Sequence, residues 1–242
     1  MQLKKLINYI VIISITVFVI TALNSNGFYH ADEHYQVLEF AIYKDGINDA
    51  KDLAWEFNEK MRSAILPTFA YVFFGILKTI GLIEPHLQNT ILRILVAILA
   101  LCTLFKSVKY AEKNLNIAGG KWLLFCALTF FTWFIPFLSV RYTAETLSGL
   151  LLVWIILESN QSKIIWYRIG VLTGLAFLIR FQILFFLVPY LVFILFKNKV
   201  IAKNTLVLLS SFAIVFCLGV LIDSWFYNEL TFTSINYLKI VL

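Results

Sequence analysis

Residues 6–23 read LINYIVIISITVFVITAL, and this uncharged apolar run follows Lys4 and Lys5. An α-helix needs about 20 mostly apolar residues to cross the hydrocarbon layer of a membrane. We therefore predict a first membrane-spanning helix here. The run is longer than the apolar part of a typical signal peptide, and no A-x-A cleavage site follows it. The helix is thus expected to stay in the protein.

The chain as a whole is also strongly apolar. Of its 242 residues, 61% are hydrophobic and 14% are charged, whereas soluble domains carry about 25% charged residues. This excludes a soluble, secreted or nucleic-acid-binding protein and leaves room for about six or seven crossings. We predict an all-α fold, a polytopic transmembrane helix bundle that takes in residues 1–242.

Two further expectations follow from residue counts. The chain has 23 Phe but only 10 Gly, a balance that favours bulky helices over a bundle held together by small-residue GxxxG contacts. The three cysteines, Cys102, Cys126 and Cys217, lie far apart within apolar runs. Because they lack the close spacing of a metal or redox pair, we expect them to be small core residues.

The distribution of charge predicts which loops lie on which side of the membrane. Basic residues mark cytoplasmic loops, and they recur in four clusters. These are Lys4 and Lys5; Lys106, Lys109, Lys113 and Lys121; Lys163 and Arg168; and Lys197, Lys199 and Lys203. Residues 24–63 instead carry eight acidic and four basic side chains, in a chain whose net charge is +6. We therefore place residues 24–63 outside, together with the turns at 141–145, at 180–182 and from 223 onward.

Residues 64–82 do not fit this alternation, because a crossing there would place the second lysine cluster outside. We predict an amphipathic, re-entrant or interfacial helix at this point, which makes it part of the first exterior region. Pro67, Gly75 and Lys78 are each less costly at the interface than at mid-membrane. A tilted span in which Lys78 reaches the surface is the alternative.

The stretch FYHADEHYQVLE at 28–39 gathers two histidines and three carboxylates just after the first span. Its HADEH matches the H-x-x-E-H pattern of inverted zinc proteases. A zinc site needs a third protein ligand, however, and this motif lies in a short loop after a membrane helix rather than in a long soluble helical domain. Asp32 and Glu33 are adjacent, so their side chains diverge and cannot flank one bond as a glycosidase pair does. One of them can act as a single general base. The alternative interpretation is an ordinary solvated acidic loop.

Four ordered pieces of this sequence resemble one known group of enzymes, the mannosyltransferases among the polytopic GT-C glycosyltransferases, which include the GPI-anchor and dolichol-linked α-mannosyltransferases. The pieces are HADEHYQ at 30–36 with Glu39; AWEF at 54–57 with RS at 62–63 and Pro67; RYTAE at 141–145; and DSWFY at 223–227 with NYLK at 236–239. Two positions depart from the usual pattern, since Ala31 replaces a Pro and Asn228 replaces a Gly. Family members are also usually much longer, so we expect this chain to be the front part of a larger enzyme.

The resemblance implies an inverting glycosyltransferase that needs neither a cofactor nor a metal ion, with residues 24–63 as its exterior catalytic loop. The expected donor is a polyprenyl- or dolichyl-phosphate hexose, with mannose as the hexose that the resemblance implies, and the expected acceptor is a lipid-linked or glycan hydroxyl. Asp32 is the implied base, with Glu33 beside it as a second catalytic candidate. The binding candidates are Arg62, Arg141 and Arg180 for phosphate, with Glu145, Gln36 and Trp55 as further contacts. Each arginine has an alternative role as an interfacial residue that reaches lipid headgroups.

Two other functions stay open at this stage. A transporter would place charged or helix-breaking residues midway along several spans, whereas here the charges gather at helix ends. A non-catalytic or truncated relative would keep the motifs without activity. Besides donor and acceptor, membrane lipids are the expected partners. Nucleic acid is not expected to bind. Frequent Lys, Ile and Asn favour a bacterial inner membrane, with the endoplasmic reticulum membrane as the eukaryotic alternative.

Overall fold

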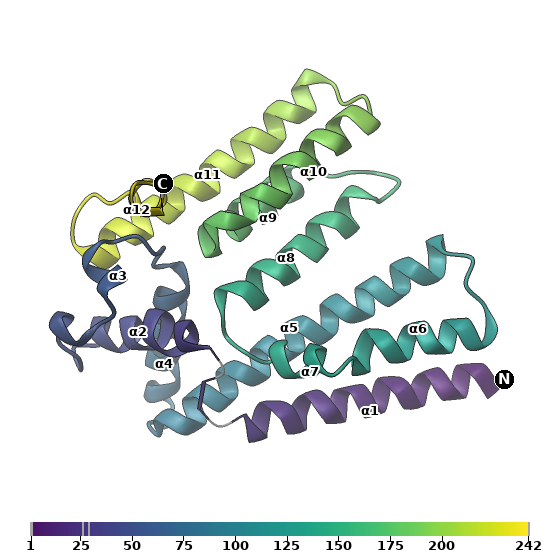
Figure 1. The fold of residues 1–242 in the computed structure, drawn as a ribbon, viewed down its shortest axis with the longest axis horizontal. Helices are drawn as coiled ribbons and strands as arrows, with labels where there is room; N and C mark the ends of the chain where they lie inside the picture. The colour runs from purple at the N-terminus through teal and green to yellow at the C-terminus, as the bar shows by residue number, and fades with distance from the viewer. Residues whose placement is uncertain (1, 26, 29, 242) are drawn as a thin grey trace. The chain divides into compact units, whose positions relative to one another are not determined.

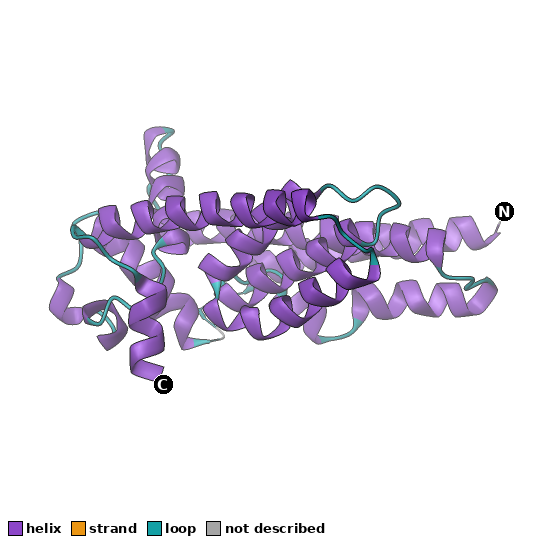
Figure 2. Cartoon of the chain, turned by 90° about the horizontal axis from the view of Figure 1, so that it is seen from above, coloured by secondary structure: helices purple, strands orange, loops and turns teal. Residues whose placement is uncertain are grey.

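The computed structural model describes residues 2–25, 27–28 and 30–241, and every regular element in these ranges is a helix (Figures 1 and 2). This confirms the all-α prediction. The chain divides into two compact units, Met1–Phe28 with Leu82–Tyr142 and Tyr29–Gly81 with Thr143–Leu242. Each unit is described by itself below.

Within the described residues, four helical segments are long and apolar enough to cross a membrane, which supports a multi-pass membrane protein. They are Leu6–Asn24, Pro85–Asn114, Gly119–Leu138 and Ala202–Tyr227. The first of them coincides with the first predicted span. Three shorter apolar segments, Ile65–Thr79, Trp166–Ile179 and Phe181–Lys197, would also have to cross if the protein has seven spans. Ile65–Thr79 (α4) has 15 residues and rises only about 22 Å. Whether α4 is re-entrant therefore stays a prediction.

The first unit is built from α1 (Gln2–Asn24), α5 (Pro85–Asn114), α6 (Gly119–Phe131) and α7 (Phe134–Leu138). Helix α5 begins at Pro85, whose fixed φ suits the first helical position, and the Glu84 carboxylate caps it by accepting the His86 and Leu87 amides. Buried Trp122 and Cys126 of α6 form a core cluster with α5, against which side chains of α1 pack. Cys126 fits the expected core role.

The same expectation is wrong for the other two cysteines. Cys102 on α5 and Cys217 on α11 are both exposed, and all three thiols are free. The reason is that these helices are apolar on nearly every side, so an apolar neighbourhood in the sequence says little about which side of the helix is buried.

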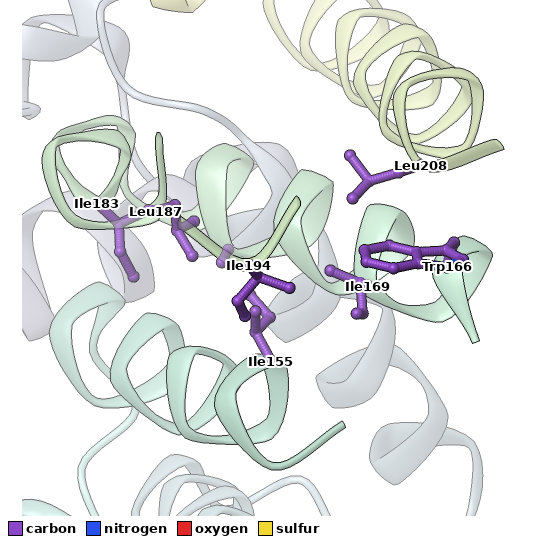
Figure 3. Close-up of a cluster of buried hydrophobic side chains, with 8 residues drawn as sticks. Ile155, Trp166, Ile169, Ile183, Leu187, Ile194 and Leu208 are labelled. Atoms are coloured by element: carbon purple, nitrogen blue, oxygen red, sulfur yellow. The ribbon is translucent and has the colours of Figure 1, made fainter. Parts of the chain in front are cut away.

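The second unit contains a bundle of α8 (Ala144–Ser159), α9 (Trp166–Ile179), α10 (Leu184–Lys197), α11 (Ala202–Tyr227) and α12 (Thr233–Val241). Figure 3 shows its core, where Ile155 of α8, Ile169 of α9, Leu187 of α10 and Leu208 of α11 meet. Helix α9 packs against both α8 and α11. The short helix α9 is therefore enclosed by longer neighbours.

Glycines set the separation of α9 and α11, so the expectation of a bundle without small-residue contacts is wrong at this place. A Cβ added to Gly170 would lie 2.3 Å from the Leu208 carbonyl oxygen, and one added to Gly174 would lie 2.8 Å from the Val215 Cβ. These glycines are four residues apart and share one side of α9, as in GxxxG packing. The glycine total did not predict this, because what matters is where the few glycines stand.

Gly170→Ala is expected to lower the stability of the protein by about 1–3 kcal/mol, because the new methyl group meets backbone that cannot turn away. Gly149→Ala on α8 is the matched control, since a Cβ there meets nothing within 4 Å and Ala favours the helix. Thermal unfolding of the full chain in detergent measures both. Equal melting temperatures for the two variants would contradict the close α9–α11 contact.

Residues 30–64 fold into short helices rather than an open loop. They are η1 (Glu33–Leu38), a π-helix, followed by α2 (Glu39–Lys44), η2 (Ala50–Asp52) and α3 (Trp55–Asn58). Phe40 and Phe57 pack with Phe226 and Tyr227 of α11 in a buried cluster. Helix α11 ends at Asn228, whose φ of 57° is left-handed. Asn and Gly are the residues that favour this conformation at a helix end, so the Asn228 departure from the family pattern preserves the local geometry.

Candidate active site

Asp32, the predicted base, directly precedes the π-helix η1, and two neighbours contact its carboxylate. The Gln36 Nε2 donates a hydrogen bond of 3.0 Å to Asp32 Oδ1, and His30 Nδ1 lies 3.6 Å from the same oxygen. The Asp32 side chain is only partly buried. A short π-helix is common at functional sites, and here it holds an accessible carboxylate in a fixed direction.

Glu33 points the other way and is fully buried at 0% exposure. The sequence predicted that the two adjacent acids would diverge, and the structure places one at the surface and the other inside. Asp32 can therefore meet a substrate hydroxyl, whereas the Glu33 side chain is enclosed by the fold. A direct catalytic role for Glu33 stays a prediction, and its burial favours a supporting role.

Glu56 connects the Asp32 side of the site to Arg62. Its Oε1 accepts 2.8 Å from Gln36 Nε2 and 3.4 Å from Arg62 Nη2. Glu56 lies on α3 and is buried. Its motif, AWEF at 54–57, did not predict a role for it, because its partners depend on how α3 packs against η1.

Arg180 follows the last residue of α9, and its guanidinium forms an ion pair with the carboxylate of Glu145. Glu145 lies in the first turn of α8, where Thr143 caps the helix by accepting from the Thr146 amide at 3.2 Å. A carboxylate in the first turn is favoured by the helix dipole. The corner after α9 thus brings Arg180 to Glu145. Phosphate binding by Arg180 and a substrate contact by Glu145 stay predictions.

The charges of Arg62 and Asp32 both act on the Arg180 guanidinium. Burial lowers the pKa of the Arg180 guanidinium, the positive charge of Arg62 lowers it further, and Asp32 and Tyr237 raise it. Two guanidinium groups kept near each other in this way repel, and the repulsion is relieved when an anion binds between them. Glu56 and Glu145 each hold one of the two arginines in position.

Two of the predicted binding residues are placed differently. Arg141 is only 4% exposed and belongs to the first unit, where its Nη1 donates 2.9 Å to the Gly27 carbonyl oxygen. Arg93 of α5 donates to the same oxygen. This gives Arg141 a role in its own unit, and phosphate binding by it stays a prediction. Trp55 begins α3 and is 59% exposed, which suits either the headgroup layer or contact with a sugar.

A pocket of about 560 Å³ is lined in part by Phe181 and Gln182, the two residues that follow Arg180 in the chain. Aromatic side chains dominate its lining, with Phe177 of α9, Phe212 and Phe216 of α11, and Tyr237 of α12. Gln182 donates to the Tyr237 hydroxyl. This pocket could not be predicted from the sequence, because its walls come from five segments that meet only in the fold.

The chain is thus a multi-pass helical membrane protein whose second unit brings three carboxylates and two arginines together at helix ends. The model of the Alg9-like mannosyltransferase family matches residues 9–240. The chain therefore belongs to this family, which confirms the resemblance that the motifs indicated.

Curated relatives agree with this placement. GPI alpha-1,2-mannosyltransferase 3 from Bos taurus is 26% identical over 86% of this chain and 38% of its own length. The Mus musculus protein of the same name is 25% identical over 96% of this chain and 43% of its own, and GPI mannosyltransferase 3 from Yarrowia lipolytica is 29% identical over 57% and 27%. The chain thus spans about two fifths of the first relatives. No solved structure gives a significant match.

Proposed function

We propose that this chain is, or forms part of, a membrane mannosyltransferase that moves mannose from a polyprenyl- or dolichyl-phosphate to a hydroxyl group. The observation that carries the proposal is the convergence of Asp32, Arg62 and Arg180 in a member of this family. An accessible carboxylate near two guanidinium groups provides the two kinds of group that the transfer needs, a base and a cationic phosphate site. The base must take up a proton, and the cationic site must receive the charge of a departing phosphate.

Asp32 is the proposed general base. It accepts the proton of the acceptor hydroxyl while the hydroxyl oxygen forms a bond to the anomeric carbon of mannose. The bond between that carbon and the phosphate oxygen breaks at the same time, and its electron pair leaves with the phosphate from the opposite face. The configuration at the anomeric carbon is thereby inverted. Gln36 holds the Asp32 carboxylate through its 3.0 Å hydrogen bond, so that little reorientation is needed during the reaction.

Arg62 and Arg180 are the proposed phosphate contacts. The phosphate changes from a diester with one negative charge to a monoester that carries nearly two at neutral pH. Cationic donors that are already in place stabilise the charge that develops in the transition state. No metal ion or cofactor enters this step, since the two arginines supply the positive charge.

The aromatic-lined pocket supports a lipid-phosphate donor over a water-soluble nucleotide sugar. The phosphate of one molecule can lie at Arg180 while its hydrocarbon chain enters the pocket between Phe177, Phe212 and Phe216. The chain comes from the apolar bilayer, so it can enter this apolar lining without a desolvation cost and gain van der Waals contacts with the rings. A nucleotide would instead expose its polar base and ribose to this apolar lining.

The acceptor class is inferred from the relatives, whose names specify GPI and an α-1,2 linkage. We infer a lipid-linked glycan as the acceptor here. All of these relatives come from eukaryotes, and they give no support to the expectation of a bacterial inner membrane. They favour the alternative, the endoplasmic reticulum membrane.

The proposal is tested with membranes that contain the chain, incubated with radiolabelled polyprenyl-phosphate mannose and a lipid-linked glycan. We expect label to appear in the glycan, and membranes without the chain to give none. The same assay with a labelled nucleotide-mannose and an inhibitor of lipid-phosphate mannose synthesis should give no product. Transfer from the nucleotide sugar alone would contradict the donor class, and no transfer from either donor would indicate a non-catalytic relative.

A further inference from the structure

The C-terminal end of α11 is hydrogen-bonded to the short segment that carries Arg62. Asp223 is only 1% exposed, and its Oδ1 accepts from the Ala64 amide at 2.7 Å and from Ser63 Oγ at 3.1 Å. One turn further on, the Tyr227 hydroxyl donates 2.8 Å to the carbonyl oxygen of Arg62 itself. Three consecutive residues of the segment thus depend on two side chains of one helix.

The same segment is held from the other side by residues after α11. Lys60 adopts a left-handed φ of 48°, which is unfavourable for a side chain of its type. The Asn236 Nδ2 donates 3.2 Å to the Lys60 carbonyl oxygen, and Lys60 Nζ pairs with Glu229 at 2.5 Å. These contacts maintain a backbone shape that the segment would not keep by itself.

Asp223 also connects the segment to α12. Its second oxygen, Oδ2, accepts 2.6 Å from Thr233 Oγ1 at the start of that helix, and α12 contributes Tyr237 to the aromatic-lined pocket. A carboxylate near the end of an apolar helix is costly unless its oxygens are satisfied. Asp223 therefore favours the one arrangement in which the Arg62 segment and α12 both meet it.

We propose that Asp223 and Tyr227 are positioning residues that fix Arg62 relative to the pocket, and so set the affinity for the lipid-phosphate donor. This inference rests on the proposed function. Residues 59–64 lie between α3 and α4 without regular helical structure. Glu56 holds the Arg62 guanidinium at 3.4 Å, and the contacts from α11 hold the backbone from which that side chain extends. Neither side chain touches the reacting atoms, and both act through Arg62.

Tyr227→Phe is the sharpest test, because the ring stays packed against Phe57 and only the hydroxyl is lost. We expect kcat/KM for the lipid-phosphate donor to fall about five- to twentyfold, mainly through a higher KM, as the loss of one hydrogen bond allows. Tyr71→Phe is the matched control, since that half-buried tyrosine on α4 also lies beside α11, with its ring 6.1 Å from the Trp225 ring. It should leave the rate unchanged.

A double-mutant cycle separates positioning from general stability. If Tyr227 acts through Arg62, then Tyr227→Phe should have no further effect on KM in an Arg62→Ala background. The same fold-loss in both backgrounds would overturn the proposal, because it would mean that the hydroxyl acts on the fold as a whole.

Hydrogen exchange gives a measurement that does not need activity. Asp223→Ala should raise the exchange rate of the Ala64 amide in the full chain in detergent at least tenfold. Asp223→Asn should stay near the original protein, because its amide oxygen can still accept from Ala64 and its nitrogen can donate to Thr233. Unchanged protection in Asp223→Ala would overturn the proposal. Absence of mannose transfer by the unaltered protein would refute the proposed function separately, since the Ala64 measurement stands on its own.

Discussion

Asp32→Asn is expected to lower the kcat of mannose transfer by about 10²- to 10⁴-fold, the range that a general base contributes. The change is nearly isosteric, and the Asn oxygen can still accept from Gln36 Nε2, which now lies 3.0 Å from Asp32 Oδ1. The amide cannot remove a proton, however. The KM for the donor should change little, because Asp32 acts on the acceptor hydroxyl. Initial rates at saturating donor measure the effect.

Asp49→Asn is the matched control for this experiment. Asp49 lies in the same region and its exposed carboxylate contacts only an equally exposed Lys51 at 3.0 Å. Such surface pairs contribute little to stability, so this variant should transfer mannose at the original rate. If Asp32→Asn transfers as fast as Asp49→Asn does, the base lies elsewhere and the assignment fails.

Arg180→Ala is expected to reduce kcat/KM for the donor by about 10²- to 10³-fold, because a preorganised charge at the departing phosphate is lost. The same change leaves the Glu145 carboxylate without its ion-pair partner, which adds repulsion against the incoming phosphate. Arg180→Ala combined with Glu145→Gln should therefore recover part of the loss. Arg180→Lys should remain impaired, since an ammonium group cannot replace the planar two-pronged contact of guanidinium.

Arg168→Ala provides the comparison at the opposite end of α9. Arg168 contacts Glu158 at 3.9 Å and is well exposed, so its loss should not change donor kinetics. Donor dependence of initial rates for the four variants distinguishes the cases. If Arg180→Ala is no worse than Arg168→Ala, then Arg180 does not contact the phosphate.

The sequence predicted those features that depend on local composition. Apolar runs located candidate spans, and the motifs at 30–36 and 62–63 led to Asp32 and Arg62. Arg180 followed from its place at a predicted exterior turn, and the structure puts its charge close enough to interact with those of Arg62 and Asp32. Features that depend on packing between distant segments could not be predicted. Glu145 pairs with Arg180 because of the turn after α9, and Glu56 becomes a link only where α3 meets η1. The low glycine total did not predict the role of Gly170, because that role depends on its position against α11.

The close contact of α9 with α11 has a consequence for how the protein enters the membrane. Helix α9 has only 14 residues, too few to span a bilayer comfortably, and it leaves the ribosome well before the 26 residues of α11. Helix α11, against which α9 packs most closely, is therefore absent when α9 first reaches the insertion machinery. We expect α9 to settle at its final depth only after α11 has been synthesised. The corner that carries Arg180 would then take its final position late in biogenesis. The candidate site would stay incomplete until α9 has packed against α11.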